Sequence, residues 1–202
     1  MIHKMKSICV FCGSSMGKNK VYRETASAFG KMLADHNITL VYGGGKVGLM
    51  GVLADSALSA GGKCIGIIPK SIADLEIAHD HLTELHIVKS MQERKTMMME
   101  IADAFVALPG GLGTLDELAE VLTYNQLRIF DKPLGLLNVN GYFDALMKFV
   151  DHGVTEGFVR PEHRDNIIVS TDANELLIKL NTYQPVHISK WIEEIKEESA
   201  LN

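Results

Sequence analysis

Short, continuously apolar runs alternate with segments of helical periodicity along most of the chain. Runs of this kind, without polar alternation, are typical of strands that are buried on both faces of a parallel sheet. The sequence predicts seven such strands, at residues 7–11, 39–42, 63–68, 85–88, 104–108, 134–139 and 166–170. Helices are predicted near residues 21–35, 48–60, 91–102, 114–127, 142–156, 172–181 and 189–198. This order predicts an α/β fold, a Rossmann-like doubly wound parallel sheet of about seven strands with helices on both faces.

The size and composition of the chain indicate one domain. Its 202 residues are 47% hydrophobic, enough for one sizeable core, and we expect a single nucleotide-binding domain over residues 1–202. The helix near residues 189–198 is expected to pack on that body or on a partner subunit.

Charge and hydropathy limit the partners that we expect. A net charge of −5 argues against nucleic acid as the main partner, because nucleic-acid binders usually carry a basic surface. The sequence has no apolar segment near the roughly 18 residues that a membrane span needs, so we expect no membrane partner. Three cysteines, few and odd in number, fit a reducing compartment, and we expect a cytoplasmic protein.

Cys9 and Cys12 form a C-x-x-C motif at the first predicted strand. The motif allows redox or metal chemistry, but side chains three residues apart on a strand point to opposite faces. We therefore interpret both cysteines as structural and predict no metal site there.

A glycine-rich turn follows the fifth predicted strand and opens onto a predicted helix. The sequence from Pro109 to Glu117 reads PGGLGTLDE. Glycines between a strand and a helix let backbone N–H groups approach an anion, and the helix N-terminus adds a favourable dipole. The turn therefore predicts a phosphate cradle, beside which Glu117 would repel the ligand and needs an explanation of its own.

Two further turns fall at the same edge of the predicted sheet. Residues 43–48 match G-x-G-x-x-G, but the ribose-binding acid of a dinucleotide site is missing, and Val47 rules out a P-loop. The alternative interpretation is that these glycines serve only tight turns and close helix packing. Residues 12–15 supply small residues and hydroxyls, including Ser14. Together the three turns predict a site for a nucleotide phosphate and sugar.

The charged residues allow more than one interpretation. Residues 90–93 match a capping box, which places Arg94 and Lys95 in the first turns of a helix, where cations are unfavourable unless an anion is near. Two solvated surface charges are the alternative. Glu117 also matches a capping box with Thr114, so its structural and catalytic roles stay equally open.

The connection over residues 69–84 is the longest without clear periodicity, and long loops in compact domains tend to be functional. His79 and His81 within it form an H-x-H pattern. No third ligand stands at a fixed spacing, so we expect a solvated loop there and not a metal site.

Four motifs together resemble one family. PGGLGTLDE at 109–117, MQERK at 91–95, VYGGGKVGLMG at 41–51 and CGSS at 12–15 are similar to the Lonely Guy (LOG) family of cytokinin riboside 5′-monophosphate phosphoribohydrolases, whose bacterial members were often labelled lysine decarboxylases. The resemblance spans roughly residues 7 to 180. It implies hydrolysis of the N-glycosidic bond of adenine-type nucleoside 5′-monophosphates to free base and ribose 5-phosphate, with no metal or cofactor. A non-catalytic nucleotide or cofactor carrier of the same fold is the alternative.

The resemblance also implies roles for particular residues. Arg94 and Glu117 match the catalytic pair. Combined with the glycine turns, it gives these substrate-binding residues: Ser14, Gly43, Gly44, Gly45, Glu76, Arg94, Lys95, Gly110, Gly111, Leu112, Gly113, Thr114, Leu115, Asp116, Glu117 and Thr123. Helical periodicity places Thr123 nearer the face of Asp116 than that of Glu117.

Two departures from the family pattern, Gln92 and the segment Arg128 to Phe130, bear on the accepted base more than on the reaction. The resemblance further implies a homodimer with active sites at or near the subunit interface.

Overall fold

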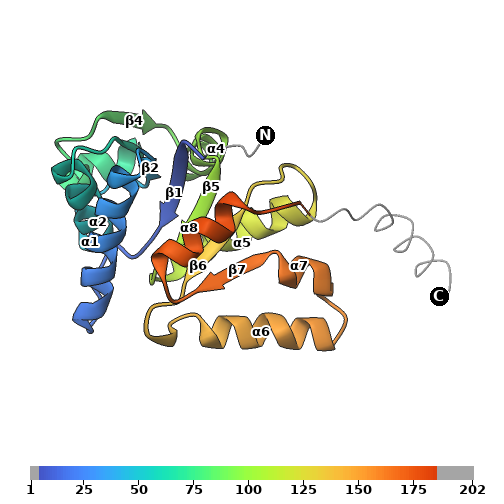
Figure 1. The fold of residues 1–202 in the computed structure, drawn as a ribbon. Coiled ribbons are helices and arrows are strands. Elements are labelled where there is room, and N and C mark those ends of the chain that lie inside the picture. The colour runs from blue at the N-terminus through green and yellow to red at the C-terminus, as the bar shows by residue number, and fades with distance from the viewer. Residues whose placement is uncertain (1–4, 186–202) are drawn as a thin grey trace.

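A seven-stranded parallel sheet forms the centre of the computed structural model, which describes residues 5–185 except for the side chain of Glu76 (Figure 1). The strand order is β4-β3-β2-β1-β5-β6-β7. The strands are β1 (Ser7–Phe11), β2 (Thr39–Tyr42), β3 (Cys64–Pro69), β4 (Glu84–Val88), β5 (Ala104–Ala107), β6 (Leu134–Leu137) and β7 (Ile167–Ser170). All seven strands were predicted, and β1 and β2 have the predicted bounds. The fold class is confirmed.

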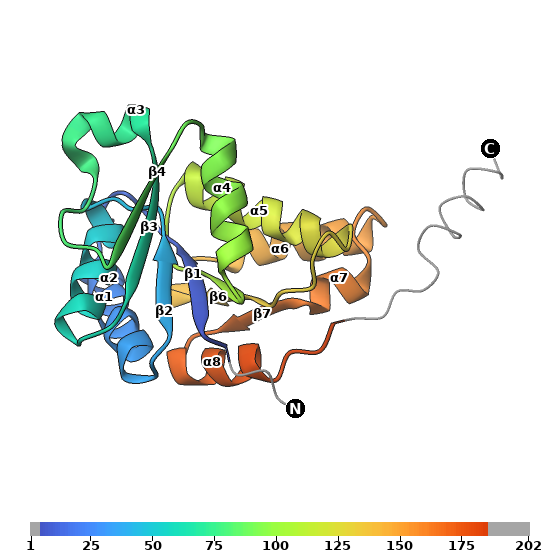
Figure 2. The same cartoon turned by 90° about the horizontal axis from the view of Figure 1, so that it is seen from above.

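Helices cover both faces of the sheet (Figure 2). The longer ones are α1 (Lys20–Asp35), α2 (Gly48–Ser59), α4 (Met91–Ile101), α5 (Leu112–Gln126), α6 (Asp144–Thr155) and α8 (Ala173–Asn181). One core cluster joins the sheet to α1, α2 and α8 through residues such as Phe29, Leu53 and Leu176. The other joins it to α4, α5 and α6 through Met98, Leu118 and Met147. Burial on both faces explains why the strands are continuously apolar.

The alternation of side chains along β1 separates the two cysteines of the C-x-x-C motif. Cys9 belongs to the cluster beneath α4, α5 and α6, and Cys12 to the cluster beneath α1, α2 and α8. Both are buried free thiols. The prediction that they point to opposite faces is confirmed.

All strands run parallel, but the order in which they are added to the sheet reverses at β1, which pairs with β2 on one side and with β5 on the other. In an open α/β sheet, ligands bind at such a switch point, beyond the carboxyl ends of the strands. The loops after β1 and β5 meet there, where the Gly13 amide donates to the Pro109 carbonyl at 3.1 Å. The topology thus joins two of the three predicted turns.

Several short elements differ from the prediction. The connection over residues 69–84 is not a plain loop, because it holds α3 (Lys70–Ile72) and a π-helical turn, η1 (Ala73–Ile77). A π turn follows a wider repeat than 3.6 residues, which hides it from helical periodicity. The helix α7 (Pro161–Asp165) and the 3₁₀ turn η2 (Val139–Gly141) are too short to give a periodic signal. The helix predicted near residues 189–198 lies outside the described residues.

Within residues 5–185, no helix combines the length and the apolar character that crossing a membrane would require.

Candidate active site

The loops after β1, β2 and β5 surround a cavity of about 240 Å³. The predicted site residues that line it are Ser14, Gly43, Arg94, Gly111, Leu112, Gly113, Thr114 and Glu117. They come from four separate stretches of the chain. The fold therefore brings together half of the substrate-binding set and both members of the predicted catalytic pair.

The turn after β5 presents free backbone N–H groups to this cavity. α5 begins at Leu112 with Gly111 as its N-cap, and its first backbone bond runs from the Leu115 amide to the Gly111 carbonyl at 3.1 Å. The amides of residues 112–114 precede that bond and have no partner within the helix. The space over Gly111 and Gly113 is open, with no atom within 4 Å of a methyl group placed there. This is the geometry of an anion site at a helix N-terminus.

Arg94 and Glu117 form a buried ion pair at the cavity wall. The Arg94 Nη1 donates to the Glu117 Oε1 at 2.8 Å, and the two side chains are 13% and 9% exposed. The Arg94 Nε donates to the Ile67 carbonyl at 3.1 Å, which fixes the plane of the guanidinium. A solvated surface charge, the alternative interpretation of Arg94, is wrong, because α4 directs this side chain into the protein against α5.

Gly43 makes room for that guanidinium. A Cβ atom at Gly43 would lie 2.1 Å from the Arg94 Nη2, closer than any real contact. The glycine is therefore required by the side chain that passes it, and turn geometry alone does not account for it.

Burial raises the pKa of Glu117, and the neighbouring Arg94 guanidinium opposes that rise. The carboxyl group thus combines a strong desolvation with a cationic partner, which is typical of groups that exchange protons or stabilise charge.

The capping-box interpretation of Glu117 is wrong. The helix starts at Leu112 and not at Thr114, so Glu117 lies in its second turn and its carboxylate bonds to Arg94. The capping box at Ser90 is confirmed in part, since the Ser90 Oγ accepts from the Glu93 amide while the Glu93 carboxylate reaches the Lys89 amide.

Lys95 on α4 and Asp116 and Thr123 on α5 lie outside the cavity lining. The Lys95 Nζ contacts the Asp116 Oδ2 at 3.0 Å and the Glu120 Oε2 at 2.8 Å. Hydrogen bonding to Glu120, and then to Asp116, raises the pKa of Lys95. The Lys95 side chain is 14% exposed, so a solvated charge is wrong here too.

Thr123 is exposed and donates to the Ala119 carbonyl of its own helix at 2.8 Å. It lies seven residues after Asp116, on the Asp116 side of the helix, as the periodicity predicted. The substrate-binding roles of Lys95, Asp116 and Thr123 stay predictions.

The remaining predicted residues surround the cavity at greater distance. Gly44 and Gly45 pair with the segment after η1 and do not line the cavity, and Leu115 is 44% exposed on the first turns of α5. Gly110 lies against the Thr114 side chain, which lets the turn close onto the helix. The side chain of Glu76 lies outside the described part of the structure.

Gly48 joins the first and second turns. It has a φ of +61°, and a Cβ atom there would lie 2.2 Å from the Ser14 backbone. The Leu49 amide also donates to the Gly13 carbonyl at 3.0 Å. Close packing of two loops explains this glycine, in agreement with the alternative that the sequence left open.

The expectation of a solvated H-x-H loop is wrong for its first histidine. His79 is 6% exposed, and its Nε2 lies 3.1 Å from the Asp55 Oδ1. Among the described residues, no group of three or more His, Cys, Asp or Glu side chains could hold a metal ion.

Three residues of this region were not predicted from the sequence. Met50 lines the cavity, the Tyr142 hydroxyl donates to the Gly110 carbonyl, and Glu120 contacts Lys95. Only Glu120 could have been found, because it lies one helical turn after Asp116.

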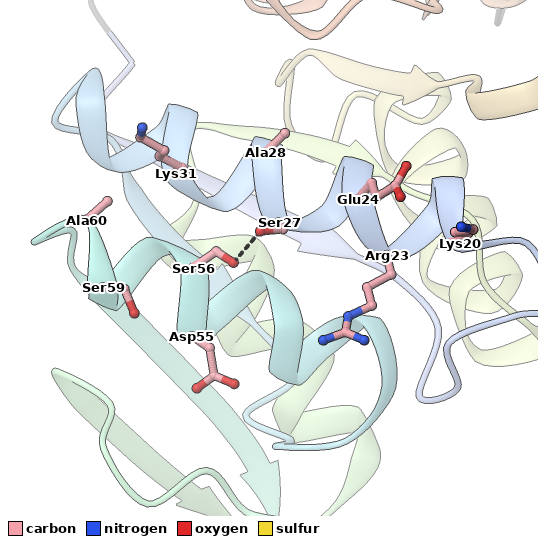
Figure 3. A pocket seen from close by; sticks show the side chains of 10 residues that line it. All are labelled: Lys20, Arg23, Glu24, Ser27, Ala28, Lys31, Asp55, Ser56, Ser59 and Ala60. Atoms are coloured by element: carbon pink, nitrogen blue, oxygen red, sulfur yellow. Dashed lines mark hydrogen bonds between the residues drawn. The ribbon is translucent and has the colours of Figure 1, made fainter.

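A larger groove of about 820 Å³ lies between α1 and α2 (Figure 3). The Ser27 and Ser56 hydroxyls bridge the two helices at 2.9 Å, and charged side chains such as Lys31 and Asp55 surround them. None of the predicted site residues lines this groove, so its size does not make it the better candidate.

The switch-point cavity, with its helix N-terminus and its buried Arg–Glu pair, defines a Rossmann-like protein with a candidate anion site beside a buried carboxylate. A family model described as "Possible lysine decarboxylase" matches residues 50–180. The chain is 48% identical over 184 residues to a cytokinin riboside 5′-monophosphate phosphoribohydrolase of Arabidopsis thaliana, covering 91% of this chain and 86% of that protein. It is also 48% identical to a probable enzyme of the same name from Oryza sativa subsp. japonica, covering 91% and 75%. The chain belongs to the LOG family.

Solved structures with the same fold are more distant in sequence. The molybdenum cofactor binding protein from Rippkaea orientalis superposes with a TM-score of 0.65 at 21% identity, covering 98% of this chain and 99% of that one. The molybdenum cofactor carrier protein from Chlamydomonas reinhardtii gives 0.65 at 22% identity, covering 87% and 95%. At these identities the likeness concerns the fold alone.

Proposed function

We propose that this protein hydrolyses the N-glycosidic bond of adenine-type nucleoside 5′-monophosphates, AMP or cytokinin riboside 5′-monophosphates, to free base and ribose 5-phosphate. The observation that carries the proposal is the buried contact of 2.8 Å between Arg94 and Glu117 at the wall of a cavity that ends in a helix N-terminus. Family membership supports the same reaction, since the curated relatives are named for it.

The 5′-phosphate would bind to the backbone amides at the start of α5. These N–H groups and the helix dipole attract a dianion without any cationic side chain. The phosphate does not react, so its binding energy can fix the orientation of the sugar in the cavity.

Glu117 would act at the sugar. When the C1′–N bond breaks, positive charge develops on the ribose ring, and a carboxylate close to that ring stabilises it or activates the attacking water. The water oxygen becomes the new hydroxyl group on C1′, and its proton goes by way of the carboxylate to the departing base. A raised pKa suits a carboxylate that accepts and then returns a proton.

Arg94 would act on the departing base. The base leaves with negative charge, and guanidinium N–H groups stabilise an anion by hydrogen bonding. Its Nη2 lies beside Gly43 at the cavity wall, while its Nη1 holds Glu117. One side chain thus touches both the carboxylate and the space available to the substrate.

The competing function is a non-catalytic carrier of a nucleotide or cofactor. The likeness to molybdenum cofactor carriers concerns only the fold, whereas a carrier has no use for a desolvated carboxylate beside its anion site. The name of the family model suggests a lysine decarboxylase, but no lysine is among the described residues that line the cavity. The hydrolase is therefore the better supported function.

The test is incubation of the purified protein with AMP and with isopentenyladenosine monophosphate, followed by chromatography for the free base. We expect base release that is lost in Glu117→Gln while nucleotide binding persists. Glu24→Gln, on the outer face of α1, is the matched control and should behave like the parent. Binding without base release from any purine monophosphate would support the carrier instead.

We also propose that the protein is a cytoplasmic homodimer whose subunits meet near the start of α5. Leu112 and Leu115 are 86% and 44% exposed there, beside an apolar pocket of about 380 Å³ that Tyr142 and Leu146 also line. Apolar patches of this kind commonly mark protein contacts. Light scattering on the eluting protein would test the dimer, and a monomeric mass would refute it.

A further inference from the structure

The segment after η1 folds back onto the second glycine turn. The Lys46 amide donates to the Ile77 carbonyl at 2.8 Å, and the His79 amide donates to the Gly44 carbonyl at 2.9 Å. Gly45 and Ala78 form an isolated antiparallel bridge between these two bonds. The turn at residues 43–45 therefore has a backbone partner on its outer side.

His79 attaches this segment to α2. Its Nδ1 accepts from the His81 amide at 3.2 Å, which leaves Nε2 as the donor nitrogen of the ring. That Nε2–H donates to the Asp55 Oδ1 at 3.1 Å. The His79 side chain is 5% exposed and that of Asp55 is 71% exposed, so a buried ring connects the turn to a surface carboxylate, which Figure 3 shows on α2.

The glycine turn connects the segment that His79 anchors to the active site. Its three successive glycines have no side chains to hold their position, and Gly44 has a φ of +73°. Gly43 packs directly against the Arg94 Nη2. A shift of the turn would change the space into which the guanidinium fits, whereas the anion site at the start of α5 lies on a different element.

We infer that His79 is a positioning residue: through its bond to Asp55 it holds the segment 77–79 on the glycine turn, and the turn sets the place of Arg94 beside Glu117. The inference rests on the proposed function and adds to it a residue outside the cavity. It separates two properties of the site, because His79 acts on the alignment of Arg94 and not on the binding of phosphate.

The experiment compares His79→Leu, His79→Gln and Asp55→Ala with the parent. His86→Gln, a partly exposed histidine on the edge strand β4, is the matched control. We expect kcat for AMP hydrolysis to fall about tenfold in His79→Leu and in Asp55→Ala, as for a small misplacement of a catalytic group. The dissociation constant for AMP should stay within about twofold, since the amides of α5 keep their place.

Rescue and coupling distinguish positioning from packing. The amide nitrogen of His79→Gln can still donate to Asp55, so kcat should recover most of the loss. Asp55→Ala should have little further effect in the His79→Leu background, because both changes remove one contact. Hydrogen exchange at the Lys46 and His79 amides should be faster in Asp55→Ala. Because the Asp55 side chain is exposed, this substitution should leave the overall fold intact.

Parent-like kcat in folded Asp55→Ala and His79→Leu, with unchanged exchange of the two amides, would overturn the inference. A parent protein that binds AMP without cleaving it would refute the proposed function alone. The exchange rates in Asp55→Ala would then still decide whether the His79 contact holds the turn.

Discussion

Gly43→Ala provides the sharpest test of the catalytic pair, because the structure gives the size of the disturbance. The new methyl carbon would lie 2.1 Å from the Arg94 Nη2, where an ordinary contact begins at 3.4 Å. The guanidinium must therefore withdraw by about 1 Å, which breaks its bond of 2.8 Å to Glu117. A hydrogen bond to a charged group contributes about 1.5–3 kcal/mol, so we expect kcat/KM to fall roughly 10- to 100-fold.

The pH profile gives the same experiment a second readout. Burial raises the pKa of Glu117 and Arg94 opposes this, so withdrawal of Arg94 raises that pKa further. A reaction that needs the ionised carboxylate loses rate as the pH falls through this pKa. The acidic limb of kcat/KM should therefore move to higher pH in Gly43→Ala.

The assay is base release from AMP measured across the pH range, on protein whose fold is checked by circular dichroism. Gly153→Ala in α6 is the matched control, since its new methyl group meets only the Val159 side chain, at 3.0 Å. A folded Gly43→Ala with a parent-like rate and an unmoved acidic limb would refute the role assigned to the Arg94–Glu117 pair.

Three further predictions concern stability and reactivity. Because burial raises the pKa of Glu117, the folded state binds its proton more tightly than the unfolded chain, and this contribution to stability is lost as the pH rises through the raised pKa. Glu117→Gln should therefore unfold at or above the parent's temperature near neutral pH, and a marked drop in calorimetry would contradict this. Burial raises the pKa of Cys9 and Cys12, so we expect no reaction of these thiols with Ellman's reagent at pH 8 before unfolding, and full reaction in denaturant. Gly48→Ala combines a positive φ with a clash against the Ser14 backbone, and urea titration should show a loss of about 3 kcal/mol or more. A loss of less than about 1 kcal/mol in the free energy of unfolding would show that the two loops can move apart with little destabilisation.

The strands and long helices follow from local patterns. A run such as residues 104–107 is apolar at every position because helices cover both faces of β5, and that burial is visible in the sequence itself. Elements shorter than two turns, such as α7, have too few residues for a periodic signal. The π turn before His79 follows a repeat that the helical pattern does not describe.

The part of the site that the backbone forms could be predicted from the sequence. Glycine-rich turns at the carboxyl ends of parallel strands must meet at one edge of the sheet, so the cavity beside α5 followed from the sequence. The roles of residues that act through their side chains were harder to predict. Lys95 directly follows Arg94 in α4, and Thr123 shares α5 with Glu117, yet neither of them lines the cavity.

The sequence by itself determined the parallel sheet, the family and the glycine turn that lines the cavity, because each depends on patterns within a few residues of one another. Only the tertiary structure decided what the charged side chains bind. Glu117 matched a capping box equally well, and its partnership with Arg94 depends on two helices packing side by side across 23 positions of the chain. His79 likewise finds Asp55 across 24 positions. Such pairs form because packing removes water from both groups and leaves each as the other's hydrogen-bonding partner, and no local pattern encodes that.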